Sequence, residues 1–136
     1  MPKPVPVPDE VSKPFWDACD QQRLVVQYCT GCERWQHPPE PLCAQCQSNG
    51  NLEFRPVSGR GTIYTYVVMH DGRVGLLQPY QPFNIAVIQL EEAPEVNMLT
   101  NLPGTGTDEV AIGSKVQVEF EEVAPGRMIP QFRVVA

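Results

Sequence analysis

Apolar and polar residues alternate along much of the second half of the chain, with the two-residue period of strands that are buried on one face. The alternation is cleanest over residues 115–123, where Val116, Val118 and Phe120 share one face and charged or amide side chains share the other. Further strands are predicted over residues 61–70, 83–91, 96–102 and 129–135, which are rich in β-branched or aromatic residues. Five strands in roughly 75 residues favour a small closed barrel.

The first half of the chain shows a different pattern. Residues 2–8 alternate proline with valine or lysine and predict an extended arm or linker. A short helix is predicted over residues 9–22, with Asp9 or Ser12 as its cap and one apolar face formed by Val11, Phe15, Trp16 and Cys19. An isolated helix of this length is only marginally stable, so its apolar face must be buried against another surface. Two alternatives stay open, packing on its own domain or docking on a partner protein.

The domain organisation follows from these elements. We expect an arm and helix over residues 1–22, a cysteine-bearing unit over 23–57 that begins and ends with short strands, and the barrel over 58–136. The 136 residues include 15 prolines, which argues against long helices and excludes a helical bundle. The predicted fold class is therefore mainly β with one N-terminal helix.

Two close pairs of cysteines give the strongest chemical signal. Cys29 and Cys32 enclose Thr-Gly, and Cys43 and Cys46 enclose Ala-Gln, with ten residues between the pairs. Two such turns supply four thiolates in a tetrahedron, which zinc prefers, and a site closed by four protein ligands is structural. We predict one Zn²⁺ per chain. Disulfides, iron in place of zinc, and His37 as a ligand are the alternatives.

The fifth cysteine, Cys19, lies on the apolar face of the predicted helix. Free cysteine is among the most buried residue types. A catalytic thiol needs an activating base or a positive neighbour, whereas Asp17 and Asp20 would raise the pKa of this one. We interpret Cys19 as a packing residue.

Charge and hydropathy argue against two classes of partner, nucleic acids and membranes. The formal net charge is -6, and an acidic chain repels the phosphates that dominate nucleic-acid affinity. No apolar run is long enough to cross a bilayer, and residues 1–8 lack the layout of a secretory signal. We therefore expect a cytoplasmic protein that binds neither nucleic acid nor membrane.

The order of these features resembles a known family. An aromatic helix, L-V-V-Q-Y-C-T-G-C, W-Q-H-P-P, the second cysteine pair and V-S-G-R-G-T at residues 57–62 follow one another, with L-T-N and I-G-S-K-V further on. This pattern is similar to the zinc-ribbon plus OB-fold family of acyl-CoA-associated proteins, over about residues 14–132. Ribbons of this sort often carry glycine after the second cysteine of a knuckle, where this chain has Glu33 and Gln47.

The resemblance implies a rubredoxin-like zinc ribbon followed by a five-stranded OB barrel. It also implies a non-catalytic subunit that stabilises a thiolase-like enzyme, in a heterotetramer of two plus two, with acyl-CoA at the interface. The partner would be a steroid side-chain retro-aldolase or another acyl-CoA lyase or acyltransferase. The chain would then be a free subunit or part of a hydratase fusion.

Three places are candidates for contact with CoA or the partner. Arg60 lies between two glycines and could reach a phosphate or a carboxylate, or could be a solvated arginine in a hinge. Leu76, Leu77 and Tyr80 lie in a long apolar loop that either meets a partner or closes the end of the barrel. The third place is the helix face with Phe15 and Trp16.

Two rival functions come from other classes. A single-strand nucleic-acid binder would use Tyr64 and Tyr66, which the alternation places on one face of a barrel strand. A stand-alone enzyme would use His70 and Asp71 as an acid–base pair. No other catalytic motif was found in the sequence, so an accessory role is preferred.

Overall fold

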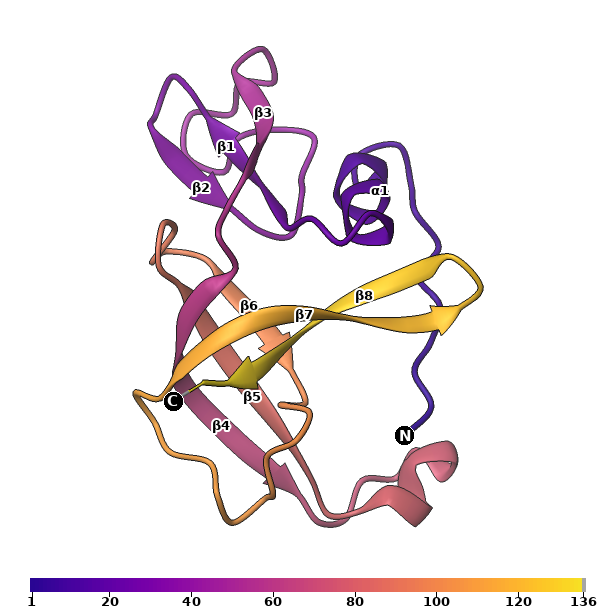
Figure 1. Cartoon of the computed structure of the whole chain (residues 1–136). Helices are drawn as coiled ribbons and strands as arrows, with labels where there is room; N and C mark the ends of the chain where they lie inside the picture. Colours follow the sequence, from indigo (N-terminus) through magenta and orange to yellow (C-terminus); the bar gives the residue numbers. More distant parts are fainter. Residues whose placement is uncertain (136) are drawn as a thin grey trace.

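The computed structural model describes residues 1–135 and contains one helix, a three-stranded sheet and a five-stranded sheet (Figure 1). The elements are α1 (Lys13–Asp20), β1 (Val25–Cys29), β2 (Arg34–Gln36), β3 (Leu52–Pro56), β4 (Arg60–Met69), the 3₁₀ helix η1 (Gly75–Tyr80), β5 (Phe83–Leu90), β6 (Asn97–Thr100), β7 (Lys115–Ala124) and β8 (Arg127–Val134). The prediction of a mainly β chain with an N-terminal helix is confirmed.

The smaller sheet carries the cysteines. β1 lies between β2 and β3 and pairs with both in the antiparallel sense. Strand β2 was not predicted because three residues are too few to show a period. β1 ends at Cys29, so the first cysteine pair begins directly at the end of a strand.

The larger sheet has the order β6-β5-β4-β7-β8, with every pair antiparallel. A β-bulge lies between Ile63 and Thr65 on β4. Bulges bend a strand and increase its twist, which helps a five-stranded sheet curl. Two glycines allow β4 to approach its neighbours, because a Cβ on Gly59 would lie 2.1 Å from the Val118 side chain and one on Gly61 would lie 2.5 Å from the Gln89 carbonyl oxygen.

Side chains close the barrel between its two edge strands. The Thr100 hydroxyl on β6 donates to Gln131 Oε1 on β8 over 2.8 Å and accepts the backbone N–H of Phe132 at 2.9 Å. Gln131 Oε1 also accepts the N–H of Asn101 at 3.0 Å. Within residues 1–135, the sheet order places no ladder between β6 and β8. The result is the partly open barrel that is typical of the OB-fold.

Helix α1 packs on its own chain, against β8 and β1. Phe15, Ala18 and Cys19 are buried in one core that also contains Val26 of β1 and Phe132 of β8. Asp20 at the end of the helix accepts a 3.0 Å hydrogen bond from the backbone N–H of Met128. Of the two alternatives for the helix face, Phe15 therefore follows the first, packing on its own domain.

The helix is shorter than predicted. Asp9 and Ser12 bond reciprocally in the turn before it, Ser12 N–H to Asp9 Oδ1 at 2.7 Å and Asp9 N–H to Ser12 Oγ at 3.1 Å. At the other end Gln22 takes φ 58° and the Arg23 N–H bonds to the Ala18 carbonyl at 2.9 Å. This is a Schellman-type end with glutamine in the place that glycine usually takes.

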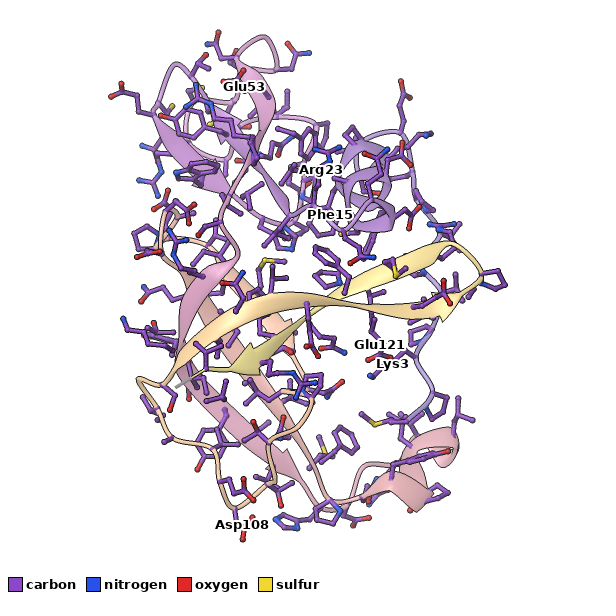
Figure 2. The ribbon with its side chains drawn as sticks, viewed as in Figure 1. Lys3, Phe15, Arg23, Glu53, Asp108 and Glu121 are labelled. Carbon is purple, nitrogen blue, oxygen red and sulfur yellow. The ribbon has the colours of Figure 1, made fainter. Side chains whose placement is uncertain are left out.

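The proline-rich arm lies beside the β7–β8 hairpin (Figures 1 and 2). Lys3 Nζ forms an ion pair with Glu121 at 3.0 Å, and the Arg127 guanidinium donates to the Pro6 carbonyl at 3.4 Å. Both contacts join the arm to the barrel. No helix in the described part of the chain is long and apolar enough to cross a membrane.

Candidate metal centre and contact surfaces

The four predicted cysteines come together at one point. Their Sγ atoms all lie within 4.8 Å of one another, and the Cys29–Cys46 and Cys32–Cys43 pairs are each separated by 3.9 Å. Four sulfurs at Zn–S distances of about 2.3 Å stand about 3.8 Å apart in a tetrahedron, so the set fits one zinc ion. All five cysteines are free thiols, so the disulfide alternative is wrong.

The electrostatics of the cysteine cluster also favour a bound cation. Backbone N–H groups of Cys46 and Gln45 lower the pKa of Cys43 to about 6, because they stabilise its thiolate. The pKa of Cys32 is raised to about 12, chiefly through its hydrogen bond to the Cys46 thiol. Four thiolates this close repel one another, and a divalent ion offsets that repulsion. When bound, zinc fixes the two knuckles and leaves no ligand position for substrate.

Both knuckles use a left-handed residue directly after their second cysteine. Glu33 has φ 55° and Gln47 has φ 63°. These are the two positions where similar ribbons often carry glycine, which takes this conformation without the steric cost that a Cβ brings. The knuckle shape is therefore kept although the usual residue is absent.

A pair of glutamines that the sequence analysis missed positions the second knuckle. Buried Gln27 on β1 accepts the Glu40 N–H at 3.0 Å and donates to the Glu40 carbonyl at 2.9 Å. Gln36 on β2 donates to Gln27 at 2.6 Å and accepts the Ala44 N–H at 2.9 Å. The signal in the sequence was an amide inside the apolar run V-V-Q-Y, which a half-buried strand tolerates only with partners.

His37 lies outside the cysteine cluster. Its ring packs on Phe15, with the ring centroids 5.1 Å apart, and its buried Nδ1 has no hydrogen-bond partner among the described residues. Burial lowers the pKa of His37 from its ordinary value of 6.5. The geometry therefore gives His37 a packing role, and Nδ1 is an orphaned polar atom.

Cys19 is fully buried. Burial, and to a lesser degree the charge of Asp20, raises the pKa of its thiol to about 12. A thiol with this pKa is protonated at neutral pH and is a poor nucleophile. The structure agrees with the interpretation of Cys19 as a packing residue.

A largely apolar groove of about 860 Å³ lies where α1, the arm and the two edge strands of the barrel meet. Half-buried Trp16 lines it from α1, Leu99 from β6 and Pro130 from β8. Both predicted helix aromatics line this groove, but Phe15 is only 2% exposed whereas Trp16 is half-buried.

Arg60 remains exposed on β4, and its guanidinium pairs with Glu91 at 2.7 Å. That bond raises the pKa of Arg60 above its ordinary value. The long loop forms η1, in which Leu76 and Tyr80 are exposed and Leu77 is half-buried. Leu77 lines a cleft of about 360 Å³ beside the arm. Neither place joins the metal site or the larger groove.

The residues of the two rival functions do not form sites. The bulge at Tyr64 breaks the alternation, so Tyr66 packs against the core while Tyr64 is 59% exposed, and the expectation of a shared face is wrong. His70 and Asp71 are both exposed after the end of β4, outside the groove and cleft described above.

Two family models match consecutive parts of the chain. Residues 16–53 match the model described as ChsH2, rubredoxin-like zinc ribbon domain. Residues 54–121 match the model described as ChsH2, C-terminal OB-fold domain. The first match covers the cysteine cluster and the second covers most of the barrel.

Several curated relatives are similar over most of the chain. A probable enoyl-CoA hydratase alpha subunit of Thermomonospora curvata is 34% identical over 88% of this chain. The 3-oxo-4,17-pregnadiene-20-carboxyl-CoA hydratase alpha subunit of Mycobacterium tuberculosis is 37% identical over 78% of it. The chain spans about a third of these two proteins, 36% and 32%. A DUF35 domain-containing scaffold protein of Methanothermobacter thermautotrophicus is 27% identical over 74% of this chain and 73% of its own length.

Among the solved structures, an aldolase chain is similar over nearly the whole fold. A chain of the structure titled Ltp2-ChsH2(DUF35) aldolase superposes with a TM-score of 0.80 and 30% identity. The match covers 95% of this chain and 98% of that one.

Proposed function

The chain belongs to the ChsH2 (DUF35) family of zinc-ribbon and OB-fold proteins, and from this we propose that it is a non-catalytic accessory subunit of a thiolase-like acyl-CoA enzyme. It binds that enzyme, stabilises it and helps to form its CoA site. Bond cleavage uses the side chains of the enzyme subunit.

The observation that carries the proposal is the near-complete structural match with a chain of an aldolase whose title names two components, Ltp2 and ChsH2. The chemistry of this chain agrees with it. Four cysteine ligands close the zinc site, and the exposed His70 and Asp71 occupy neither groove nor cleft. These residues suit a scaffold better than a reacting centre.

The finer proposal is a steroid side-chain retro-aldolase, in a heterotetramer of two enzyme and two accessory chains with acyl-CoA at the interface. A relative named for a pregnadiene carboxyl-CoA and a solved structure named as an aldolase support it. We place the complex in the cytoplasm, because reducing conditions keep thiols available for zinc.

Co-expression with a thiolase-fold protein from the same source tests the proposal. We expect the two proteins to co-elute from a size-exclusion column, with a light-scattering mass equal to two chains of each. Separate elution of the two zinc-loaded proteins would overturn the accessory role. A co-eluting complex of a different mass would overturn only the stoichiometry.

A further inference from the structure

The middle of strand β5 is apolar on both faces although the barrel covers only one of them. Its inward residues are all buried, and three of its four outward residues, Phe83, Ile85 and Val87, are apolar and half-buried, with Gln89 as the polar exception. In antiparallel sheets a solvated face normally carries polar side chains, whereas an unbroken apolar run is typical of a strand buried on both sides. The sequence N-I-A-V-I therefore points to an additional covering layer over β5.

The neighbouring strands continue this apolar surface. Val67 on β4 lies opposite Ile85, and Leu99 on β6 lies opposite Val87. Val67 is 55% exposed and Leu99 is 66% exposed. We call these four side chains, Val67, Ile85, Val87 and Leu99, the β4–β6 face. All four are aliphatic, and Thr65, which lies opposite Val87 on β4, is uncharged, so the face carries no charge.

The other half of the same barrel provides an internal comparison. The outward positions of β7 are all polar: Lys115, Gln117, Glu119 and Glu121. Glu119 forms an ion pair with Arg133 of β8 at 2.8 Å. Solvated strands of this barrel thus follow the usual alternation, which makes the apolar outward residues of β5 a local departure from it.

The chain's own arm already covers one end of the face. Pro2 and Pro4 line the cleft of about 360 Å³ together with Met69, Phe83 and Ile85. At the other side, Ile85 and Leu99 also line the groove of about 860 Å³. The β4–β6 face is therefore continuous with a hollow that remains open beside it.

We propose that the β4–β6 face is the docking surface for the enzyme subunit, an inference that rests on the proposed function. The partner surface is an apolar patch with basic residues at its border. Three exposed acids, Glu91, Glu92 and Glu95, follow β5 at one end of the face, and Glu91 forms an ion pair with Arg60. A basic border complements these acids, whereas a second copy of this chain brings a further net charge of -6.

Binding of the purified thiolase-fold protein to wild type, Leu99→Glu and Leu76→Glu by calorimetry tests the proposal. Leu76 lies on η1, the other predicted contact, so Ile112→Glu is added as the matched control, because Ile112 is 65% exposed and lies before β7, outside both places. We expect Leu99→Glu to weaken binding by more than about tenfold, because a carboxylate would be buried without a partner, and Ile112→Glu to bind as wild type does. Val67→Glu should reproduce the loss, with circular dichroism and zinc content unchanged.

The outcomes separate the two proposals. Failure of wild type to bind would overturn the accessory function and this inference with it. Equal binding by wild type, Leu99→Glu and Val67→Glu would overturn the docking surface and leave the function standing. Loss of binding in Leu76→Glu with wild-type binding by Leu99→Glu and Ile112→Glu would overturn the β4–β6 face and assign the contact to η1. A wild-type dimer that Leu99→Glu converts to a monomer would assign the face to a second copy.

Discussion

The Thr100 hydroxyl on β6 donates a 2.8 Å hydrogen bond to the side-chain carbonyl of Gln131 on β8, and both residues are buried. The same hydroxyl accepts the backbone N–H groups of Phe132 at 2.9 Å and Leu102 at 3.2 Å. Hydrogen bonds of two side chains therefore join β6 to β8, whereas ladders of backbone hydrogen bonds join the other neighbouring strands of the barrel.

Replacing the Thr100 hydroxyl with a methyl group in Thr100→Val should destabilise the chain. The change keeps the shape but removes the acceptor for the N–H groups of Phe132 and Leu102, at a cost of roughly 1–3 kcal/mol for each unpaired buried donor before relaxation. We expect the free energy of unfolding in urea to fall by about 2 kcal/mol or more. Thr65→Val, on an exposed position of β4, is the control and should change it little. Equal stability of both variants would show that the seam does not depend on this network.

The left-handed backbone at Glu33 predicts a substitution that stabilises the protein. Glu33→Gly should raise the free energy of unfolding by about 0.5–1 kcal/mol with zinc bound, because glycine adopts φ 55° without steric strain. Glu33→Ala keeps the Cβ and should bring no gain. Thermal unfolding of the zinc-saturated proteins measures both. A gain in the alanine variant equal to that in the glycine variant would show that the side chain, not the backbone, is the cause.

The half-buried His37, whose Nδ1 atom is buried, should make stability depend on pH. Its pKa is lowered in the folded state, so the unfolded chain binds the proton more tightly and protonation favours unfolding. The stability contributed by neutral His37 is fully present above pH 6.5, the ordinary pKa of histidine. It is lost as the pH falls toward the lower pKa of His37 in the folded state.

As the pH is lowered from about 7 to about 5.5, the free energy of unfolding measured in urea should therefore fall less for His37→Phe than for wild type. His70→Phe, which changes the exposed histidine, should keep the wild-type slope. Zinc release at low pH affects all three proteins and cancels in the comparison. Parallel pH profiles for wild type and His37→Phe would contradict the assigned role.

The metal site predicts a sharp effect of ligand loss. Cys29→Ser removes one of four thiolates and should reduce bound zinc from one ion per chain to a small fraction, with a lower melting temperature. Cys19→Ser is the matched control, because Cys19 is buried outside the cluster and should leave the zinc content unchanged. Wild-type protein that folds normally without stoichiometric metal would contradict a structural zinc site.

The metal ligands and the barrel strands could be predicted from the sequence because each depends on local spacing. The four cysteines were found from two pairs, and β7 from its alternation over residues 115–123. The Gln27–Gln36 network could not be, because it depends on the register between β1 and β2. The bulge at Tyr64 was invisible for a similar reason, since an extra residue in one strand shifts the face of each later side chain.

The helix shows a different limit of sequence reasoning. Phe15 and Trp16 are adjacent and were placed together on one apolar face. Successive residues on a helix are about 100° apart, so Phe15 is buried in the core while Trp16 is only half-buried, although both line the groove. Which of the two would be covered depends on β8, which lies more than a hundred residues away in the chain.

The most direct test of the accessory role measures acyl-CoA cleavage in three mixtures. They contain the thiolase-fold protein alone, the thiolase-fold protein with the zinc-loaded chain, and the zinc-loaded chain alone. We predict no turnover by the chain alone, weak turnover by the enzyme subunit alone, and a rise of at least about tenfold in the complex, which His70→Ala leaves unchanged. Turnover by the chain alone that His70→Ala abolishes, or full activity of the enzyme subunit without it, would contradict the account.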